Sequence, residues 1–477
     1  MNKLNNLSPQ AKASIIYSFA SFFSKGISII TLPLFTRLMT SAEIGVVTTF
    51  TSWQTIISVF ATLSLGTGSF SIAMLEFEKE RDRYESSILT LSTISSVIVL
   101  SIYILFSDYF SELLGLNRVL ITVMLISFVF TPAMDYWLAR QRYEYNYKKT
   151  AIVSLSSTLL TTLATILCVV LVKYNCDAEL GSVRVLSMSC VQILFGLFFY
   201  FSIMHHGKTF INKKYWSFAL KVNMPLMIHA LAKHILDVSD RIMISSMVGN
   251  SAVGIYGTLY SISSLSLIVW TAMNASLIPY MFEKMKANQN AAINHIINPI
   301  FFIYAVVAFL LTLMSPEIVH ILATAEYYEA IYMMPAVAAG IFLTAVYNVF
   351  GNVLLYLKKT VFIMCSTIVA AIVNILLNYF LIPKYGYIVA AYTTLLAYII
   401  LAILQYSFVK IVMKEKIFNA KYITAISVMS IVLMLSCNFL YKTTIVRYII
   451  LALVILSLFV FRKKIIQLLK SLKKKDI

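Results

Sequence analysis

The most unusual chemistry in this sequence is a set of ionisable residues inside one long apolar segment. Within positions 218–247, imidazole, ammonium, carboxylate and guanidinium groups recur at helical spacing: His229, Lys233, Asp237, Asp240 and Arg241. On an α-helix of 3.6 residues per turn they form one polar stripe. A charge in the hydrocarbon core of a membrane costs about 2.5–3.5 kcal/mol on insertion scales. We therefore expect the stripe to face protein or a water-filled cavity.

Two interpretations of this stripe remain open. Lys233 and Asp237 are four residues apart, as are Asp237 and Arg241, and this is the spacing of ion pairs along one helix. Such pairs would only hold the helix to its neighbours. Alternatively, the cations form part of a path for an anionic group. Lys25, deep in the first apolar run, and Arg37, at its end, would add to such a path.

A second group of ionisable residues lies at the end of the apolar segment 119–138. Asp135 is followed closely by Arg140 and Arg142. These three residues are candidates for a cytoplasmic gate. The alternative, which the sequence favours for Asp135, is that a basic loop anchors the segment at the membrane surface.

No residue pattern of an enzyme occurs. There is no phosphate-binding loop, no acid–base cluster in a loop and no nucleophile elbow. The five cysteines show no metal-ligand spacing, and we predict that they are free thiols. We expect no catalytic residue, no bound metal and no cofactor.

The composition identifies the elements that must position these residues as membrane-spanning helices. Hydrophobic residues make up 60% of the 477 positions and charged residues 12%, with a mean hydropathy of +0.85. A soluble chain would carry roughly twice that charge. Runs of about 20 apolar residues match the hydrocarbon thickness of a membrane. We predict an all-α polytopic membrane protein with fourteen spans: 15–36, 44–73, 87–106, 119–138, 151–172, 183–204, 218–247, 253–281, 296–315, 331–356, 360–382, 387–409, 422–441 and 446–461.

The net charge of +18 does not indicate a nucleic-acid partner. The basic residues are concentrated in every second segment between spans and at the C-terminus, and cytoplasmic segments of membrane proteins have this bias. It predicts that both termini are cytoplasmic. The alternate segments lean acidic, with Glu317, Glu326 and Glu329 in one of them. We expect no cleaved signal peptide, so the first apolar run stays as the first helix.

A weak internal repeat divides the predicted helices. Residues 41–50 resemble residues 250–259, and the same alignment places Lys25 opposite His234. Both segments follow a helix that runs outward, so the repeat is parallel. It predicts an N-lobe of helices 1–6 (1–205), a cytoplasmic basic linker (206–217), a C-lobe of helices 7–12 (218–412), helices 13–14 (413–461) and a cytoplasmic basic tail (462–477).

Several motifs resemble those of a known family. Residues 374–386 (NILLNYFLIPKYG) are similar to the junction of helices eleven and twelve in bacterial polysaccharide flippases. Leu32 to Arg37 resembles the end of their first helix, Asp240-Arg241 with residues 253–256 their seventh, and residues 135–149 their junction of helices four and five. These flippases belong to the multidrug/oligosaccharidyl-lipid/polysaccharide exporter superfamily. The resemblance implies two bundles around a central cavity that opens alternately to each side.

The resemblance implies a flippase, in the bacterial inner membrane, for O-antigen units linked to undecaprenyl pyrophosphate. Lys25, Lys233 and Arg241 would then bind the pyrophosphate, with Arg37 at the outer mouth and His229 nearby. We expect Lys25 and Lys233 to face each other across the cavity. Asp237 or Asp240 would carry a coupling proton or cation. The expected partners are the lipid-linked oligosaccharide, membrane lipids and other polysaccharide assembly proteins, and no nucleic acid.

Two other transport functions fit the same fold. A drug or cation exporter would need an acidic cavity, whereas the residues here predict a basic one. A flippase for the lipid-linked peptidoglycan precursor shares the charge pattern and is separated poorly by the sequence. A membrane-embedded glycan polymerase or ligase needs a long outer loop, which is absent from the sequence.

Overall fold

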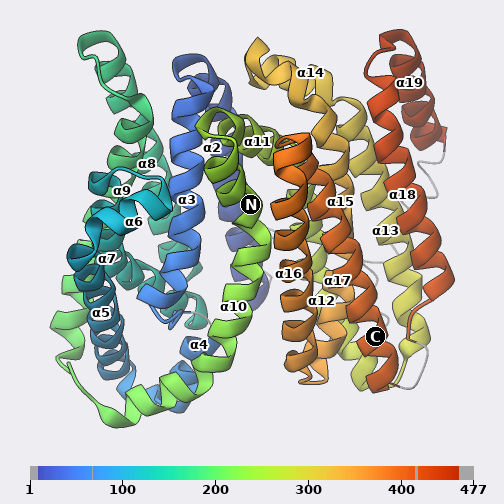
Figure 1. Cartoon of the computed structure of the whole chain (residues 1–477). Helices are drawn as coiled ribbons and strands as arrows, with labels where there is room; N and C mark the ends of the chain where they lie inside the picture. The colour runs from blue at the N-terminus through green and yellow to red at the C-terminus, as the bar shows by residue number, and fades with distance from the viewer. Residues whose placement is uncertain (1–8, 67, 414–416, 461–477) are drawn as a thin grey trace. The chain divides into compact units, whose positions relative to one another are not determined.

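The computed structural model confirms an all-α membrane fold. It describes residues 9–66, 68–413 and 417–460, and within these ranges every regular element is a helix. Figure 1 draws these helices as coiled ribbons, with the colour running from blue near the N-terminus to red near the C-terminus. The predicted basic tail at 462–477 lies outside the described residues, as do positions 414–416, between two predicted spans, and position 461, the end of the last predicted span.

Contacts along the chain define two compact units, residues 1–255 and 256–477. The first unit contains long helices with short ones between them. They are α2 (Pro9–Leu38), α3 (Ser41–Ala61), α4 (Gly68–Glu76), η1 (Glu78–Glu80), α5 (Arg81–Leu105), α6 (Ser107–Leu114), α7 (Arg118–Tyr143), α8 (Tyr147–Asn175), α9 (Leu180–Gly207), α10 (Lys213–Met247) and the start of α11 (Asn250–Ser263). The predicted division into lobes at 206–217 remains a prediction.

The second unit contains the end of α11 and the remaining helices. These are α12 (Ser266–Lys286), α13 (Asn290–Leu313), α14 (Ser315–Leu322), η2 (Ala325–Met333), α15 (Met334–Tyr356), α16 (Thr360–Tyr385), α17 (Val389–Met413), α18 (Ala420–Leu440) and α19 (Thr444–Val460). A bend of 46° separates α11 from α12.

Each of the fourteen predicted spans is helical over most of its described length, but their number as membrane spans is not confirmed. Ten helices in the described part of the chain are long and apolar enough to cross a membrane, or eleven with the bent pair α11–α12. The three predicted spans that are not among these eleven correspond to α2, α10 and α19. The 17 residues of α19 make it short, and α10 carries the charged stripe. The number fourteen therefore stays a prediction.

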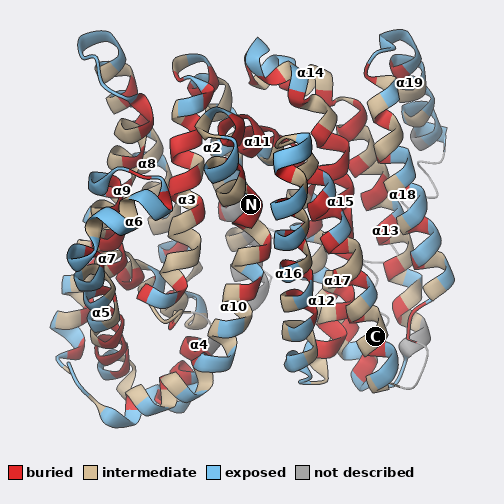
Figure 2. Ribbon diagram, in the orientation of Figure 1, coloured by how far each residue is buried: buried red, intermediate tan, exposed pale blue. Residues whose placement is uncertain are grey.

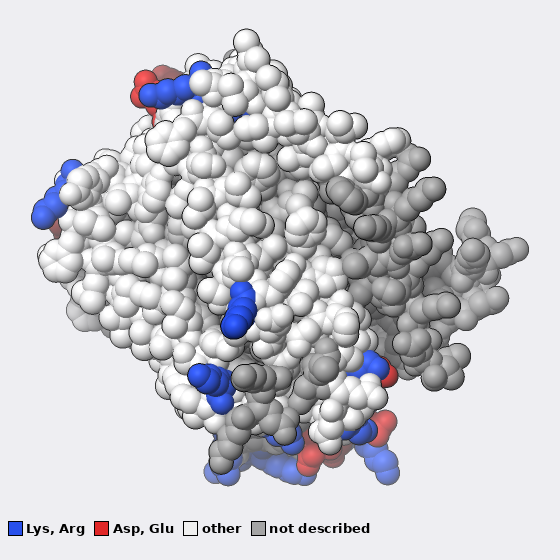
Figure 3. All heavy atoms as spheres, turned by 90° about the vertical axis from the view of Figure 1, so that its right-hand side faces the viewer, with Lys and Arg blue, Asp and Glu red and all other residues white. Residues whose placement is uncertain are grey.

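Burial separates inner helices from peripheral ones (Figure 2). In the second unit, 83% of the most apolar stretch of the helical segment that includes α15 is buried. In the first unit, only 11% of the most apolar stretch of α8 is buried. Large apolar side chains such as Leu163, Phe198 and Phe439 are exposed. The face drawn in Figure 3 is largely uncharged, and most of its Lys, Arg, Asp and Glu side chains lie near the upper and lower margins. An apolar exterior of this kind is what a bilayer requires.

One predicted span is interrupted. The sequence predicts a continuous helix over 44–73, but α3 ends at Ala61 and α4 begins at Gly68. Leu63 and Ser64 have positive φ values of 52° and 49°, and the side-chain amide of Asn223 in α10 donates a hydrogen bond to the Leu63 carbonyl. The broken backbone is therefore satisfied by a polar side chain, as membrane-embedded irregular structure requires.

The repeated segments contact each other through their two glycines. A Cβ atom on Gly45 of α3 would overlap the carbonyl oxygen of Asn250, and one on Gly254 of α11 would overlap the carbonyl oxygen of Ser41. Because the repeat aligns Gly45 with Gly254 and Ser41 with Asn250, the two contacts are equivalent. The hydroxyls of Ser41 and Ser251 are also hydrogen-bonded. Only glycine permits backbones to approach this closely.

The segment that joins α9 to α10 is packed tightly against α5. A Cβ atom on Gly207 would overlap the carbonyl oxygen of Asp82. The Ser86 hydroxyl donates to the Thr209 carbonyl (3.0 Å), and the Trp216 indole N–H donates to the Ser87 carbonyl (3.0 Å). The linker and the first turns of α10 are therefore fixed to the first unit.

Candidate functional site

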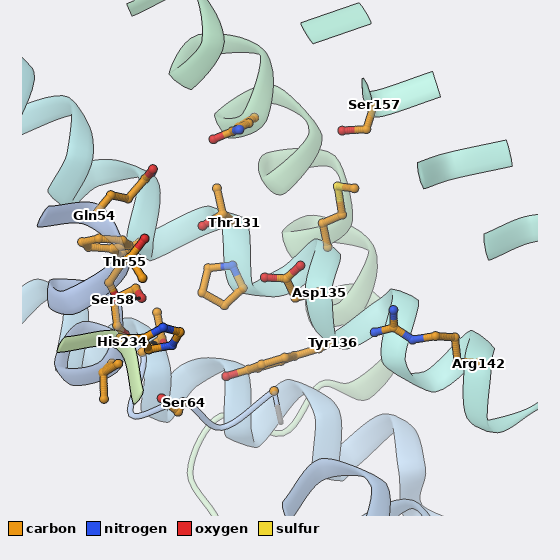
Figure 4. Close-up of a pocket in the computed structure, with 17 residues that line it drawn as sticks. Gln54, Thr55, Ser58, Ser64, Thr131, Asp135, Tyr136, Arg142, Ser157 and His234 are labelled. Carbon is orange, nitrogen blue, oxygen red and sulfur yellow. Dashed lines mark hydrogen bonds between the residues drawn. The ribbon is translucent and has the colours of Figure 1, made fainter. Parts of the chain in front are cut away.

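The first unit contains a cavity of about 630 Å³, and most of the residues that line it are polar but uncharged (Figure 4). Helices α3, α7, α8, α9 and α10 and the interrupted segment 62–66 contribute to it. The lining residues are Gln54, Thr55, Ser58, Val59, Thr62, Ser64, Gly66, Phe128, Thr131, Pro132, Met134, Asp135, Tyr136, Arg142, Ser157, Gln192 and His234. The volume lies in the range of about 300–1,000 Å³ typical of ligand sites.

Local sequence explains how two of these walls form. In α3, the residues Gln54, Thr55 and Ser58 recur at helical spacing, so their side chains share one face, and Thr62 follows directly after the helix. In α7, Pro132 lies inside the helix and is itself part of the wall. Proline removes one backbone hydrogen bond of a helix and favours a kink there. Thr131 and Asp135, one turn apart, lie beside it.

The predicted gate residues separate into two locations. Asp135 and Arg142 both line the cavity, and Figure 4 shows the Asp135 carboxylate directed into it. Within the described residues neither side chain makes a hydrogen bond or an ion pair. Arg140 instead points to a cluster of carboxylates. It pairs with Asp82, with the buried Glu85 (3.0 Å) and with Glu144 (3.0 Å).

The charged stripe of α10 lies outside this cavity, although the cavity reaches the same helix through His234. Lys233 is paired with Asp237, and the Arg241 guanidinium donates to the Asp237 carbonyl (2.9 Å). Asp240 is buried and accepts the backbone N–H of Arg241 (2.7 Å). The i,i+4 pairing that the sequence suggested for Lys233 and Asp237 is present. A role of the stripe in transport stays a prediction.

The remaining predicted site residues are dispersed. Lys25 and Arg37 are exposed on α2, and the Arg37 guanidinium donates to the Pro33 carbonyl of its own helix (3.4 Å). His229 is half-buried in α10. None of these three residues lines the cavity. That Lys25 and Lys233 face each other across a cavity remains a prediction.

Sequence reasoning missed most of the cavity wall. Gln54, Ser58, Thr131 and Gln192 are uncharged polar residues within segments predicted to be spans, and such residues resemble those that bridge packed helices. The signal that was available is the spacing of the polar residues in α3. No group of His, Cys, Asp and Glu that could hold a metal ion occurs in residues 9–66, 68–413 and 417–460.

A buried amide network joins α16 to α17 in the second unit. The Asn374 amide donates to the Thr394 hydroxyl (3.2 Å), and the Asn378 amide donates to the Asn374 side-chain oxygen (3.2 Å). The Thr393 hydroxyl donates to Asn378. All four residues are buried. The network therefore bridges the two helices.

We expect the Asn378→Ala substitution to lower the free energy of unfolding by about 1–2 kcal/mol. It removes two buried hydrogen bonds, each of which contributes roughly 0.6–1.7 kcal/mol inside membrane proteins. Thermal unfolding of the purified chain in detergent measures the effect. Asn348→Ala is the control, because Asn348 lies half-buried on α15 in the same unit without a hydrogen bond of its side chain to any described residue. Equal melting temperatures of the two variants would contradict the expectation.

Comparisons with known proteins agree with this architecture. A family model described as polysaccharide biosynthesis protein matches residues 11–285, and a second model, MatE, matches residues 225–380. The "Probable low-salt glycan biosynthesis flippase Agl15" of Haloferax volcanii is 23% identical over 170 residues. That match covers 35% of this chain and 36% of the relative's length.

Solved structures show the same fold at low sequence identity. The lipid II flippase MurJ in an inward closed conformation has a TM-score of 0.71 at 18% identity, over 94% of this chain and 100% of that chain. An inward-facing MATE family multidrug resistance transporter has a TM-score of 0.60 at 14% identity, over 84% and 96%. A MOP superfamily transporter from Pyrococcus furiosus, described as having a binding pocket of reverse polarity, has a TM-score of 0.52 at 15% identity. The match covers 87% of this chain and 98% of that chain.

Proposed function

Because the chain belongs to the polysaccharide biosynthesis protein family of the multidrug/oligosaccharidyl-lipid/polysaccharide exporter superfamily, we propose that it is a lipid-linked oligosaccharide flippase. Its cargo would be a glycan unit such as an O-antigen repeat on undecaprenyl pyrophosphate. The protein would move that unit from the cytoplasmic to the periplasmic leaflet of the bacterial inner membrane by alternating access. The observation that carries the proposal is the polar cavity of about 630 Å³ within an otherwise apolar membrane protein.

The chemistry of the cavity wall suits a glycan. Sugar hydroxyls both donate and accept hydrogen bonds, and they lose their water partners when they enter a membrane protein. Hydroxyl and amide side chains replace those partners in both directions. Gln54, Ser58, Thr131, Ser157 and Gln192 are of this kind.

The charge of the cargo assigns a role to Arg142. A pyrophosphate needs cationic donors when it leaves water, because an unpaired ion in a low-dielectric medium is very costly. Among the described residues, Arg142 is the Lys or Arg residue that lines the cavity, so we assign it first contact with the pyrophosphate. Lys25, Lys233 and Arg241 would act further along the path, with Arg37 at its outer mouth. For Asp237 or Asp240 we retain the proposed coupling to a proton or cation.

A deletion strain tests the proposed function directly. We expect surface glycan to disappear while lipid-linked units accumulate on the cytoplasmic side. In proteoliposomes, the purified chain should move a fluorescent lipid-linked oligosaccharide from the inner to the outer leaflet. A membrane-impermeant quencher added outside should then quench the label from both leaflets. Unchanged surface glycan in the deletion strain, together with no transbilayer movement in vesicles, would contradict the proposal.

The same deletion strain and proteoliposomes distinguish the proposed function from the alternative functions. A multidrug exporter would accumulate cationic dyes in the proteoliposomes and leave surface glycan intact in the deletion strain. A flippase for the peptidoglycan precursor would be essential for growth. We expect a viable deletion strain and no dye transport.

A further inference from the structure

A second cavity, of about 540 Å³, lies in the second unit where α14, η2 and the start of α19 meet. Its wall is mainly apolar, with Pro316, Ile321 and Ile331 among the lining residues. Its polar lining residues are Glu317, His320, Tyr328, Thr444 and Arg447. The charge pattern of the sequence predicts that this end of the unit is on the outer side of the membrane.

The guanidinium of Arg447 is deeply buried and only partly satisfied. The residue is 4% exposed, and its Nη2 atom pairs with Glu317. Its Nε and Nη1 atoms are buried without a hydrogen-bond partner, as is the second carboxylate oxygen of Glu317. Tyr448 donates a further hydrogen bond to Glu317 (2.9 Å). Buried unsatisfied donors are rare and costly, and these two guanidinium nitrogens lack an acceptor.

Two neighbouring features also favour an anion. The helix α19 begins at Thr444, which lines the cavity, and the first backbone N–H groups of a helix have no partner within it and carry partial positive charge. The imidazole Nδ1 of His320, a residue that lines the cavity, is hydrogen-bonded to the Tyr328 hydroxyl (2.7 Å), so its other ring nitrogen is the one available to a ligand. A phosphate oxygen could accept from each of these groups.

The surroundings indicate that the anion belongs to an amphiphile. Ile321 at the cavity rim is 62% exposed, and α19 continues from the cavity with a row of exposed apolar residues that includes Ile445, Ile449 and Leu453. A free inorganic anion gains nothing from such a surface, whereas each buried CH₂ group of a lipid chain contributes about 0.8 kcal/mol. We propose that this cavity binds the phosphate of a membrane lipid, with the acyl chains lying along α19.

Binding of a short-chain lipid to the purified full chain tests this site. The protein in neutral detergent is titrated with dihexanoyl phosphatidic acid, with inorganic phosphate and with dihexanoylglycerol, and heat release is followed by calorimetry. We expect saturable binding of the phosphatidic acid alone. In the Arg447→Gln variant, loss of the charged donor should weaken that binding at least tenfold. Arg118→Gln is the matched control, since Arg118 is an exposed arginine that is paired with Asp108 in the first unit.

A double variant that replaces both charges with amides distinguishes loss of binding from misfolding. Arg447→Gln alone leaves the Glu317 carboxylate without its cation, whereas Arg447→Gln with Glu317→Gln retains an amide pair of similar shape. The double variant should fold and still bind the phosphatidic acid at least tenfold more weakly. Equal affinity of the variants and the parent protein would overturn the proposal. If inorganic phosphate bound as tightly as the phosphatidic acid, the lipid assignment would be wrong. It would also be wrong if dihexanoylglycerol bound as tightly as the phosphatidic acid and did so without Arg447.

Discussion

Replacing Arg142 with alanine is expected to reduce transport of a lipid-linked oligosaccharide by about 10- to 100-fold. Arg142 lines the polar cavity and makes no hydrogen bond or ion pair within the described part of the chain, so its donors are available to the cargo. Charge-assisted hydrogen bonds contribute roughly 1.5–3 kcal/mol each, and each 1.4 kcal/mol corresponds to a factor of ten. Lysine at this position should restore part of the rate, because it keeps the charge but not the planar fork of donors.

The initial rate of transbilayer movement in proteoliposomes measures this effect. Lys148→Ala is the matched control, because Lys148 is an exposed cation of the same basic segment that lies outside the cavity. Arg140 would be a poor comparison, since its loss leaves the buried Glu85 without its partner and should impair folding. If the Arg142→Ala and Lys148→Ala proteins moved the cargo at equal rates, the role assigned to Arg142 would be wrong.

A single methyl group on Gly45 is expected to separate the repeated segments and stop transport. In Gly45→Ala the new Cβ atom would overlap the carbonyl oxygen of Asn250. A backbone atom cannot rotate away as a side chain does, so the two helices must move apart. Overpacking typically costs about 1–3 kcal/mol, which corresponds to a roughly 5- to 150-fold change in the population of the contact. Gly254→Ala should act equally, because its contact with Ser41 is the equivalent one.

Disulfide cross-linking reports this contact directly. With the native cysteines replaced, Ser41→Cys and Ser251→Cys should cross-link readily, because the two hydroxyls are hydrogen-bonded in the structure. Adding Gly45→Ala should remove most of the cross-link. Gly26→Ala is the control, since a Cβ atom on Gly26 would meet nothing within 4 Å. A cross-link that persists in Gly45→Ala would show that the contact tolerates the methyl group.

The sequence predicts most of the helices because apolar length is a local property. Predicted spans such as 151–172 and 360–382 lie within α8 and α16. It does not predict the break after Ala61, the short helices α6 and α14, or the contacts of the linker with α5. Those features depend on tertiary partners, such as the Asn223 side chain that satisfies the Leu63 carbonyl. A hydropathy pattern contains no information on such partners.

The candidate site is only partly readable from the sequence for the same reason. Charge inside an apolar run singled out α10, and charge near a helix end singled out Asp135 and its neighbouring arginines. The direction of each side chain depends on helix packing, and it separates Arg142 in the cavity from Arg140 in a carboxylate cluster two residues earlier. The neutral wall formed by Gln54 and Gln192 carries no signal that distinguishes cargo contact from helix packing.

The attachment of the linker and α10 to α5 also constrains how the chain is made. The Ser87 carbonyl accepts a hydrogen bond from Trp216, and the Leu63 carbonyl accepts one from Asn223. Each carbonyl therefore meets its donor only after more than a hundred further residues have been synthesised. At about 5–20 residues per second, these carbonyls wait roughly 6 to 30 seconds for their partners. During that interval the interrupted segment after α3 lacks the Asn223 side chain that satisfies the Leu63 carbonyl in the complete fold.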